Sequence, residues 1–288
     1  MQVVPRLLLN PHAARGRARA RIDPLVRAER IEVREVDGPA AMTVEARRAA
    51  EEGLERLLVA GGDGAIHHAI RGLAGTECAL GIVPLGTGND LARALGVSCD
   101  PVAATRSALR AAWRPIDLGR VDGVPFAGVA GLGIDGEVNR RLPAFRALPA
   151  RLAYAAATLR AVASFDPLAV EVDCGATTLS GPALLLAFAN SPWFGGGMHI
   201  APTARLDDGE LDLVLVRPVR FVTLLRVFPR VYRGRHLGHP AVHTARLRVA
   251  RVRCKVPWTI YADGEPIAEC GVDGCSIDIW PRALRVVA

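Results

Sequence analysis

The chain has 288 residues and a formal net charge of +7, and half of its residues are hydrophobic. Because one domain usually holds roughly 100–200 residues, this length favours two domains, and the composition excludes a disordered chain. No apolar run reaches the roughly 18 residues that a membrane-spanning helix needs. The positive charge suits an anionic partner, such as a membrane surface, a nucleotide or a nucleic acid.

The first third of the sequence alternates short apolar runs with amphipathic stretches. It predicts strands at 3–9, 31–36, 57–60 and 79–83, and helices at 17–30, 44–52, 66–73 and 89–95. Strands that alternate with helices in this way are typical of a mainly parallel α/β sheet covered on both faces. We therefore expect an α/β nucleotide-binding domain over residues 1–116.

From residue 117 onward, strand-like runs bounded by Gly, Pro and Asp predominate. Strands are predicted at 169–174, 183–189, 211–216, 246–256 and 276–280, with helices at 151–163 and 221–231. Along 246–256 apolar and basic residues alternate, and the alternation shifts near Ala250, which predicts a β-bulge there. The pattern indicates a mostly antiparallel β domain over 117–288, with the active site expected in the cleft between the two domains.

The cysteines and the N-terminus indicate a cytoplasmic protein. None of the six cysteines forms a Cys-x-x-Cys pair, which argues against a zinc ribbon or a redox motif. The first nine residues are predicted to form a strand and lack the basic and apolar regions of a signal peptide. We therefore expect reduced thiols.

The first candidate phosphate-binding segment is an apolar strand that ends in Gly61-Gly62-Asp63-Gly64. Its glycines let backbone N–H groups approach a phosphate chain, and the next helix N-terminus adds partial positive charge. Asp63 follows the carboxyl end of a strand, where open α/β sheets bind ligands, and an acidic residue there is expected to help hold Mg²⁺. On its own, the same sequence would also make an ordinary tight turn.

The second segment is the run Pro-Leu-Gly-Thr-Gly-Asn-Asp, residues 84–90, which also follows a strand. Thr87 and Asn89 offer side-chain donors to phosphate oxygens, and Asn89 or Asp90 is expected to cap the following helix. Neither segment is a Walker A sequence, and neither fits the G-x-G-x-x-G dinucleotide pattern. Two glycine turns at successive strand ends predict a phosphate-binding site.

Together these two segments resemble the catalytic-domain signature of the diacylglycerol kinase family, which includes soluble bacterial lipid kinases, sphingosine kinases and ceramide kinases. Further matching segments follow in the family's order: Asn10-Pro11, Asp117-Leu118-Gly119, residues 131–135, residues 194–197, Ala201-Pro202, Asp207-Asp208-Gly209 and Asp263-Gly264-Glu265. The resemblance covers nearly the whole chain. It implies a lipid kinase that transfers the γ-phosphate of ATP to a hydroxyl of a membrane lipid, with diacylglycerol expected first.

The resemblance also implies roles for individual residues. Glu265 would be the general base, and Asp63 would organise Mg²⁺ at the ATP phosphates through water. The remaining ATP-site residues would be Asn10, Gly61, Gly62, Gly64, Gly86, Thr87, Gly88, Asn89, Asp90, Asp117 and Arg151. A second, structural Mg²⁺ would be held by the carboxylate of Asp208 and the backbone carbonyls of Arg205 and Glu210.

Three departures from the family pattern leave alternatives open. The loop after Asn10-Pro11 lacks the usual Ser-Gly or Gly-Gly, Ala65 stands where Thr is usual, and His67-His68 stands where Asn-Glu is common. Ala65 and His68 suggest a non-catalytic nucleotide- or lipid-binding protein as one alternative, and an NAD kinase, which also uses Gly-Gly-Asp-Gly, is the other.

Partners are also implied by the resemblance. We expect ATP, a lipid substrate, peripheral contact with the anionic inner face of the membrane, and a homodimer as an option. Nucleic acid is not expected, because aromatic residues make up only 5% of the chain and no recognition motif is present.

Overall fold

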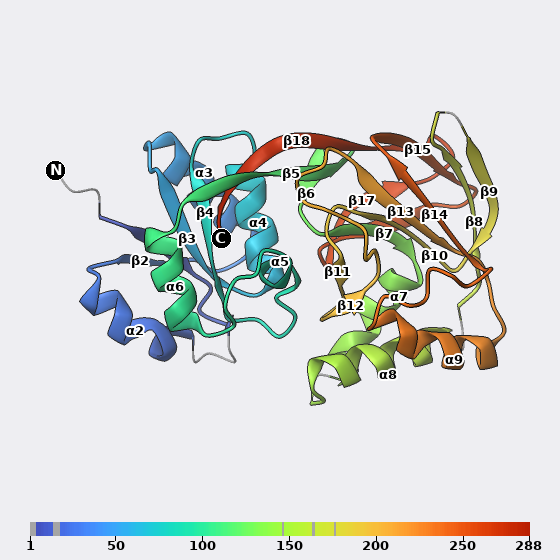
Figure 1. Cartoon of the computed structure of the whole chain (residues 1–288), viewed down its shortest axis with the longest axis horizontal. Helices are drawn as coiled ribbons and strands as arrows, with labels where there is room; N and C mark the ends of the chain where they lie inside the picture. Colours follow the sequence, from blue (N-terminus) through green and yellow to red (C-terminus); the bar gives the residue numbers. More distant parts are fainter. Residues whose placement is uncertain (1–3, 14–17, 146, 163–164, 176) are drawn as a thin grey trace. The chain divides into compact units, whose positions relative to one another are not determined.

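The computed structural model describes the whole chain except residues 1–3, 14–17, 146, 163–164 and 176. It divides into two compact units (Figure 1): unit 1 comprises Met1–Leu118 and Pro281–Ala288, and unit 2 comprises Gly119–Trp280. Two strands, β5 (Trp113–Val121) and β18 (Cys275–Val287), run from one unit into the other. The sequence did not predict that the C-terminal segment returns to unit 1.

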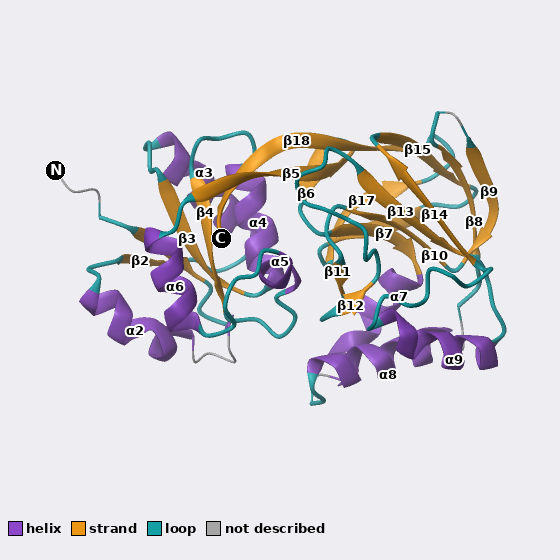
Figure 2. Cartoon of the chain, in the orientation of Figure 1, coloured by secondary structure: helices purple, strands orange, loops and turns teal. Residues whose placement is uncertain are grey.

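Unit 1 is built on a parallel sheet with the strand order β2-β1-β3-β4-β18. Its other strands are β1 (Arg6–Leu9), β2 (Glu32–Glu35), β3 (Arg56–Gly61) and β4 (Ala79–Pro84). Its helices are α2 (Ala18–Ala28), α3 (Pro39–Glu51), α4 (Asp63–Leu73), α5 (Asp90–Ala94) and α6 (Pro101–Arg110) (Figure 2). The predicted parallel α/β domain is confirmed.

Helices cover both faces of this sheet because its central strands are apolar on both sides. In β3, Leu58 packs in one core cluster with Ile22 of α2 and Ala108 of α6. Leu57 and Val59 point to the opposite face and are also fully buried, where α4 packs on β3 and α3 packs on α4. Continuous burial of this kind is what a parallel sheet between two helical layers requires.

Unit 2 contains strands of two large antiparallel sheets and a two-stranded antiparallel sheet, β11-β12. One has the order β14-β13-β10-β7-β16-β17, and the other includes β18-β15-β8-β9 with β5 and β6. The remaining strands are β6 (Val124–Phe126), β7 (Val129–Gly133), β8 (Leu168–Asp173), β9 (Thr178–Ala183), β10 (Leu185–Ala189), β11 (Trp193–Phe194), β12 (Met198–His199), β13 (Leu211–Val216), β14 (Val242–Leu247), β15 (Val249–Cys254), β16 (Trp258–Ala262) and β17 (Glu265–Cys270). The helices are α7 (Ile134–Arg141), η1 (Leu142–Phe145), α8 (Ala150–Val162) and α9 (Phe221–Val231). No helix in the described part of the chain is long and apolar enough to cross a bilayer.

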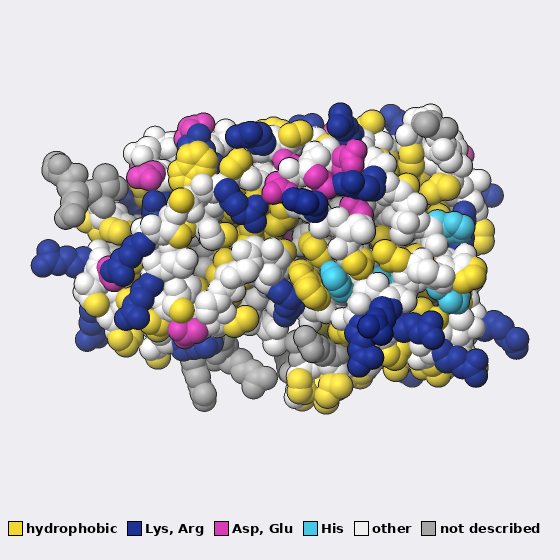
Figure 3. All heavy atoms as spheres, in the orientation of Figure 1, with side chains coloured by type: hydrophobic (Ala, Val, Ile, Leu, Met, Phe, Trp, Pro, Cys, Tyr) yellow, Lys and Arg dark blue, Asp and Glu magenta, His cyan; other side chains and the backbone are white. Residues whose placement is uncertain are grey.

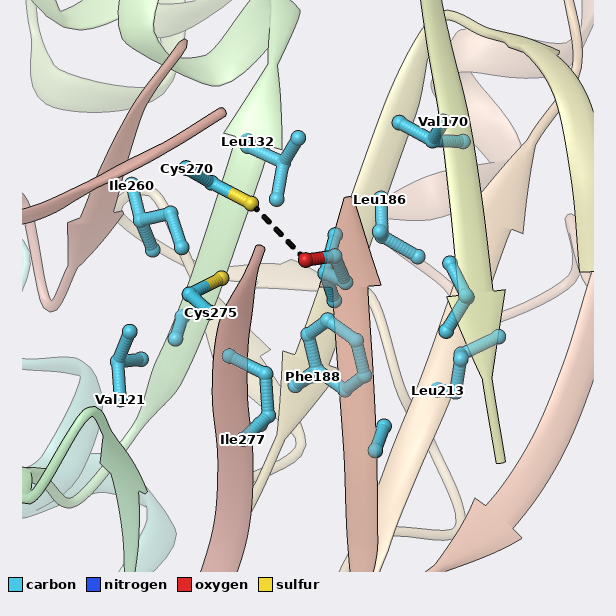
Figure 4. Packing of buried hydrophobic residues seen from close by; sticks show 14 of the residues in the cluster. Val121, Leu132, Val170, Leu186, Phe188, Leu213, Ile260, Cys270, Cys275 and Ile277 are labelled. Atoms are coloured by element: carbon cyan, nitrogen blue, oxygen red, sulfur yellow. Dashed lines mark hydrogen bonds between the residues drawn. The ribbon is translucent and has the colours of Figure 1, made fainter. Parts of the chain in front are cut away.

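The core of unit 2 takes apolar residues from strands of both sheets, including Phe188 of β10 and Ile277 of β18 (Figure 4). Cys270 lies in this core, and its thiol donates a hydrogen bond to the carbonyl oxygen of Val252 at 3.3 Å. A hydrogen bond to Cys270, together with burial, raises the pKa of Cys275. All six cysteines are free thiols in the structure.

The strand predicted over 246–256 is wrong in one respect. There is no single strand with a bulge near Ala250, because the chain leaves one sheet after Leu247 and enters the other at Val249. Leu247 and Ala250 are both buried in the shared core. The shift in alternation therefore marks the passage from one sheet to the other, which keeps the apolar side chains inside on both strands.

Candidate functional site

The predicted phosphate-binding loops lie together at one edge of the unit 1 sheet. Strands β1, β3 and β4 are parallel neighbours, and the register pairs Leu9 with Ala60 and Gly61 with Pro84. The backbone N–H of Asn10 donates to the carbonyl of Ala60 at 3.0 Å, which fixes the start of the first loop. Because these strands end at the same edge, the loops that follow them are adjacent.

The two glycine turns touch through their backbones. A Cβ atom added at Gly86 would lie 2.5 Å from the Cα of Gly62 and 2.9 Å from the side-chain oxygen of Asn89. The N–H of Leu85 also donates to the carbonyl of Gly61 at 2.8 Å. Glycine is therefore needed at Gly86 for the two turns to approach this closely, and at Gly62 an added Cβ would make a tight contact of 3.2 Å with the Cα of Gly86.

Asp63 joins the first turn to the second. One oxygen of its carboxylate accepts the N–H of Asn89 at 2.8 Å, and the other accepts the N–H of Asp90 at 2.8 Å. These two amides open helix α5, so the negative charge of Asp63 also lies at a helix N-terminus. The carboxylate thus acts as a clamp across 26 residues of sequence.

Asn89 is the N-cap residue of α5, as predicted, but its side chain does not supply the capping hydrogen bond. Asn89 has a left-handed backbone (φ 53°) and makes no side-chain cap. Its side chain turns back to Gly86, where it accepts the N–H at 3.0 Å and donates to the carbonyl at 2.9 Å. Asp63 supplies the cap from the other turn, which the local sequence pattern could not indicate.

The other predicted ATP-site residues differ in their surroundings. Thr87 is exposed at the tip of the second turn. Asp90 pairs with Arg93 at 2.7 Å, and Arg93 also donates to the carbonyl of Gly88 at 3.3 Å. Asp117 is buried in β5, where its carboxylate accepts the N–H of Arg282 at 2.7 Å. Asp117 therefore helps to fix the end of β18 in unit 1.

The remaining predicted residues of unit 1 are Gly61, next to Asn10, and Gly64 in the first turn of α4. A Cβ at Gly61 would lie 3.7 Å from the Cβ of Asn10. The unusual pair His67 and His68 is buried in α4, with the rings edge to face at 5.2 Å.

Glu265 lies in unit 2, at the start of β17 and directly after a hairpin turn. Ala262 pairs with Glu265, and the two residues between them, Asp263 and Gly264, both have positive φ (53° and 92°). Positive φ at both central residues is the geometry of a type I′ hairpin turn. The Asp-Gly-Glu segment is therefore a hairpin whose third residue is the candidate base.

The side chain of Asp263 holds this hairpin in place, a role that the sequence did not reveal. Its carboxylate accepts three backbone N–H groups, from Ala127 at 3.1 Å, Gly128 at 2.9 Å and Val129 at 3.1 Å. A Cβ at Gly128 would lie 2.4 Å from Asp263 Oδ1. The only sequence signal is that Asp263 belongs to the same matched segment as Glu265.

The predicted structural Mg²⁺ site, formed by the Asp208 carboxylate and the backbone carbonyls of Arg205 and Glu210, stays a prediction, and the side chains around it form ion pairs. The guanidinium of Arg246 pairs with the carboxylate of Asp208 and, at 3.1 Å, with that of Glu210. The side chain of Arg205 pairs with Asp207 at 3.4 Å, which leaves its predicted ligand, the backbone carbonyl, untested. In the described part of the chain, no group of three His, Cys, Asp or Glu side chains is arranged to hold a metal ion. Arg246 therefore balances part of the negative charge of Asp208 and Glu210 in the described structure.

Arg151 lies in helix α8, but its side chain is outside the described part of the structure. Its predicted contact with phosphate therefore stays a prediction.

Comparison with known proteins places both units in one family. The family model described as "Diacylglycerol kinase catalytic domain" matches residues 5–121. The model described as "YegS C-terminal NAD kinase beta sandwich-like domain" matches residues 128–288, more than half of the chain.

Curated relatives agree with the family models. A diacylglycerol kinase of Mycobacterium tuberculosis (strain H37Rv) is 35% identical over 83% of this chain and 78% of its own length. A diacylglycerol kinase of Bacillus subtilis (strain 168) is 29% identical over 76% of this chain and 74% of its own. A probable lipid kinase, YegS-like, of Chromohalobacter salexigens is 34% identical over 60% of this chain and 57% of its own.

Solved structures show the same fold. Two crystal structures of Bacillus anthracis str. Sterne proteins align over 99% of this chain with TM-scores of 0.82 and 0.76. The alignments cover 94% and 96% of the two solved chains, and the second structure is described as that of a diacylglycerol kinase. At 21% and 19% identity, they support the fold alone.

Proposed function

The chain belongs to the diacylglycerol kinase family, and on this premise we propose that it transfers the γ-phosphate of ATP to a hydroxyl of a membrane lipid, with diacylglycerol as the first candidate. Family membership indicates a lipid kinase. The nucleotide, the metal, the base and the particular lipid belong to the proposal.

The observation that carries the proposal is the pair of glycine turns joined by Asp63. Glycines at 62 and 86 allow the two backbones to meet, and the Asp63 carboxylate holds the second turn against the first. Phosphoryl transfer depends mainly on positioning and on charge neutralisation. Two fixed turns at the carboxyl edge of a parallel sheet are suited to positioning a phosphate chain.

The oxygen ligands near these turns fit a Mg²⁺ that is bound through water. Carboxylate oxygens are ligands that Mg²⁺ prefers, and the two backbone N–H groups that Asp63 accepts hold its carboxylate between the two turns, so we propose that it reaches the metal through water. Asp90 and Asp117 are the other acids proposed for this network. When bound, Mg²⁺ would neutralise charge on the phosphate oxygens.

Glu265 is proposed to take the proton of the lipid hydroxyl as a general base. The support is its position in a hairpin that three backbone hydrogen bonds to Asp263 hold against Ala127–Val129. A fixed backbone limits the positions that the Glu265 carboxylate reaches, and a base must be held within hydrogen-bond reach of the proton that it removes.

Labelled Mg-ATP and a total lipid extract in mixed micelles test the proposal. We expect wild-type protein to label a lipid and Glu265→Gln to lose most of this activity with unchanged thermal stability. Glu269→Gln is the matched control, because Glu269 is an exposed glutamate on the same strand. Full activity of Glu265→Gln would reject Glu265 as the base.

The same assay separates the alternative functions. Labelling of NAD without any labelled lipid would indicate an NAD kinase, and ATP binding without any phosphate transfer would indicate a non-catalytic protein.

A further inference from the structure

Helix α9 presents an apolar face to solvent. None of its residues is buried, and Phe221, Val222 and Leu225 keep 46%, 57% and 43% of their surface exposed. Monomeric proteins rarely expose several large apolar side chains side by side without a binding role.

The opposite face of α9 packs against the core of unit 2. Leu224 packs on the cluster that contains Ala157 and Ala161 of α8, and Val231 packs on the cluster that contains Ile200 and Val214. The inner side of the helix is thus satisfied by unit 2. The exposed apolar residues are not needed for this packing.

Arginines lie beside the exposed apolar strip. Residues three or four apart share a face of a helix, so Phe221 and Leu225 form one row and Arg226 and Arg230 form another, while Arg233 follows just after the end of α9. Figure 3 shows Lys and Arg side chains gathered where Figure 1 places α9, with hydrophobic side chains beside them. An apolar strip with a basic flank is the pattern of a helix that lies in the surface of a bilayer.

The stretch of sequence that contains α9 is strongly basic. No Asp or Glu occurs between Asp212 and Asp263, whereas this stretch holds ten arginines and one lysine. The whole chain has a net charge of only +7, so the rest of it is net acidic. Within the described part of the chain, Arg226, Arg230 and Arg233 form no ion pair, so their charge is available to an anionic partner.

From these observations we infer that the exposed face of α9 is a docking surface for an anionic lipid bilayer. Phe221, Val222 and Leu225 would enter the headgroup boundary, and the three arginines would contact lipid phosphates. The inference deepens the proposed function, since it rests on a membrane lipid as substrate and names the part of unit 2 that reaches the membrane. Its basis is charge complementarity together with the apolar strip.

Vesicle flotation without nucleotide tests the docking surface directly. Vesicles of phosphatidylcholine with phosphatidylglycerol are compared with vesicles of phosphatidylcholine alone. We expect wild-type protein to bind only the anionic vesicles, and less tightly at high salt. At about a fivefold loss for each arginine, the triple variant Arg226→Gln/Arg230→Gln/Arg233→Gln would bind on the order of 100-fold more weakly.

A second triple variant, Arg27→Gln/Arg47→Gln/Arg106→Gln, is the matched control. It removes the same charge from exposed helix positions of unit 1 and is expected to bind as the wild type does. The variant Val222→Ser/Leu225→Ser keeps every arginine and tests the apolar strip, so it is expected to weaken binding as well. Equal binding by wild type and the α9 arginine variant would overturn the inference.

Two further readouts separate the possible failures. Activity on dioctanoylglycerol in detergent micelles is expected to be unchanged in the α9 variants, because these micelles do not require bilayer docking. Wild-type binding to vesicles without lipid phosphorylation would reject the proposed function while supporting the surface. A dimer in solution that Val222→Ser/Leu225→Ser dissociates, with vesicle binding intact, would assign the surface to a second copy and overturn the inference.

Discussion

Replacing Asp63 with Asn is expected to loosen unit 1 as well as to lower activity. The carboxylate accepts two backbone N–H groups at 2.8 Å, and hydrogen bonds to charged groups contribute about 1.5–3 kcal/mol each. The Asn side chain keeps one acceptor and turns an NH₂ group toward the other amide. We expect a loss of about 2–4 kcal/mol from the free energy of unfolding, from one lost charged bond and one amide left without its acceptor.

Urea unfolding, followed together with the amide NMR signals of Asn89 and Asp90, measures this effect. The loss of stability would be confined to unit 1, and the two amide signals would move more than those of unit 2. Asp37→Asn is a suitable control, because Asp37 is an exposed aspartate of the same unit. An unfolding free energy within about 0.5 kcal/mol of wild type, the usual range for neutral surface changes, would refute the clamp.

The remaining predictions address the turns, the acidic cluster and a buried histidine. Gly86→Ala places a Cβ 2.5 Å from backbone, so it is expected to abolish ATP binding in calorimetry, whereas Gly238→Ala, with no atom nearby, is expected to bind normally. If the guanidinium of Arg246 takes the place of a metal at Asp208, millimolar Mg²⁺ is expected to leave the melting temperature of the nucleotide-free wild type unchanged. The same Mg²⁺ is expected to raise the melting temperature of Arg246→Ala. Equal shifts in the two proteins would contradict the idea that Arg246 replaces a metal. Burial lowers the pKa of His236 in the folded protein, so between the two pKa values the unfolded chain binds a proton at this residue and the folded chain does not. The free energy of unfolding is therefore expected to fall as the pH drops below about 6.5. In His236→Gln the free energy of unfolding is expected to fall less steeply over the same pH range.

The sequence predicted the elements of unit 1 well, because apolar strands and amphipathic helices leave strong periodic patterns. It predicted α9 over 221–231 and β13 over 211–216 with the observed bounds. It failed at Arg248, because a change of alternation looks the same for a bulge and for a passage between two sheets. It also missed α6 over 101–110, where small residues weaken the apolar pattern.

The candidate site shows a different limit. The sequence predicted that Asp63 and the second turn contribute to the same phosphate-binding site. It could not show that Asp63 caps α5, because a capping residue 26 positions away leaves no local sequence pattern. Asp263 was missed as an anchor for a related reason: its three partners, at 127–129, lie more than a hundred residues earlier. Long-range contacts from a side chain to the backbone are settled only by the fold.

This arrangement decides which substitutions can assign chemistry. Asp63 is part of the architecture of the turns, so an inactive Asp63→Asn protein could lack a metal ligand, an ordered turn or both. A substitution of Asp263 in unit 2 would be equally ambiguous, since Asp263 fixes the hairpin that carries Glu265 and its loss would also displace Glu265. Glu265 itself follows the turn, and the anchor hydrogen bonds belong to Asp263. Loss of activity in Glu265→Gln with the hairpin intact would therefore report on proton transfer, and we regard it as the more decisive of the two experiments.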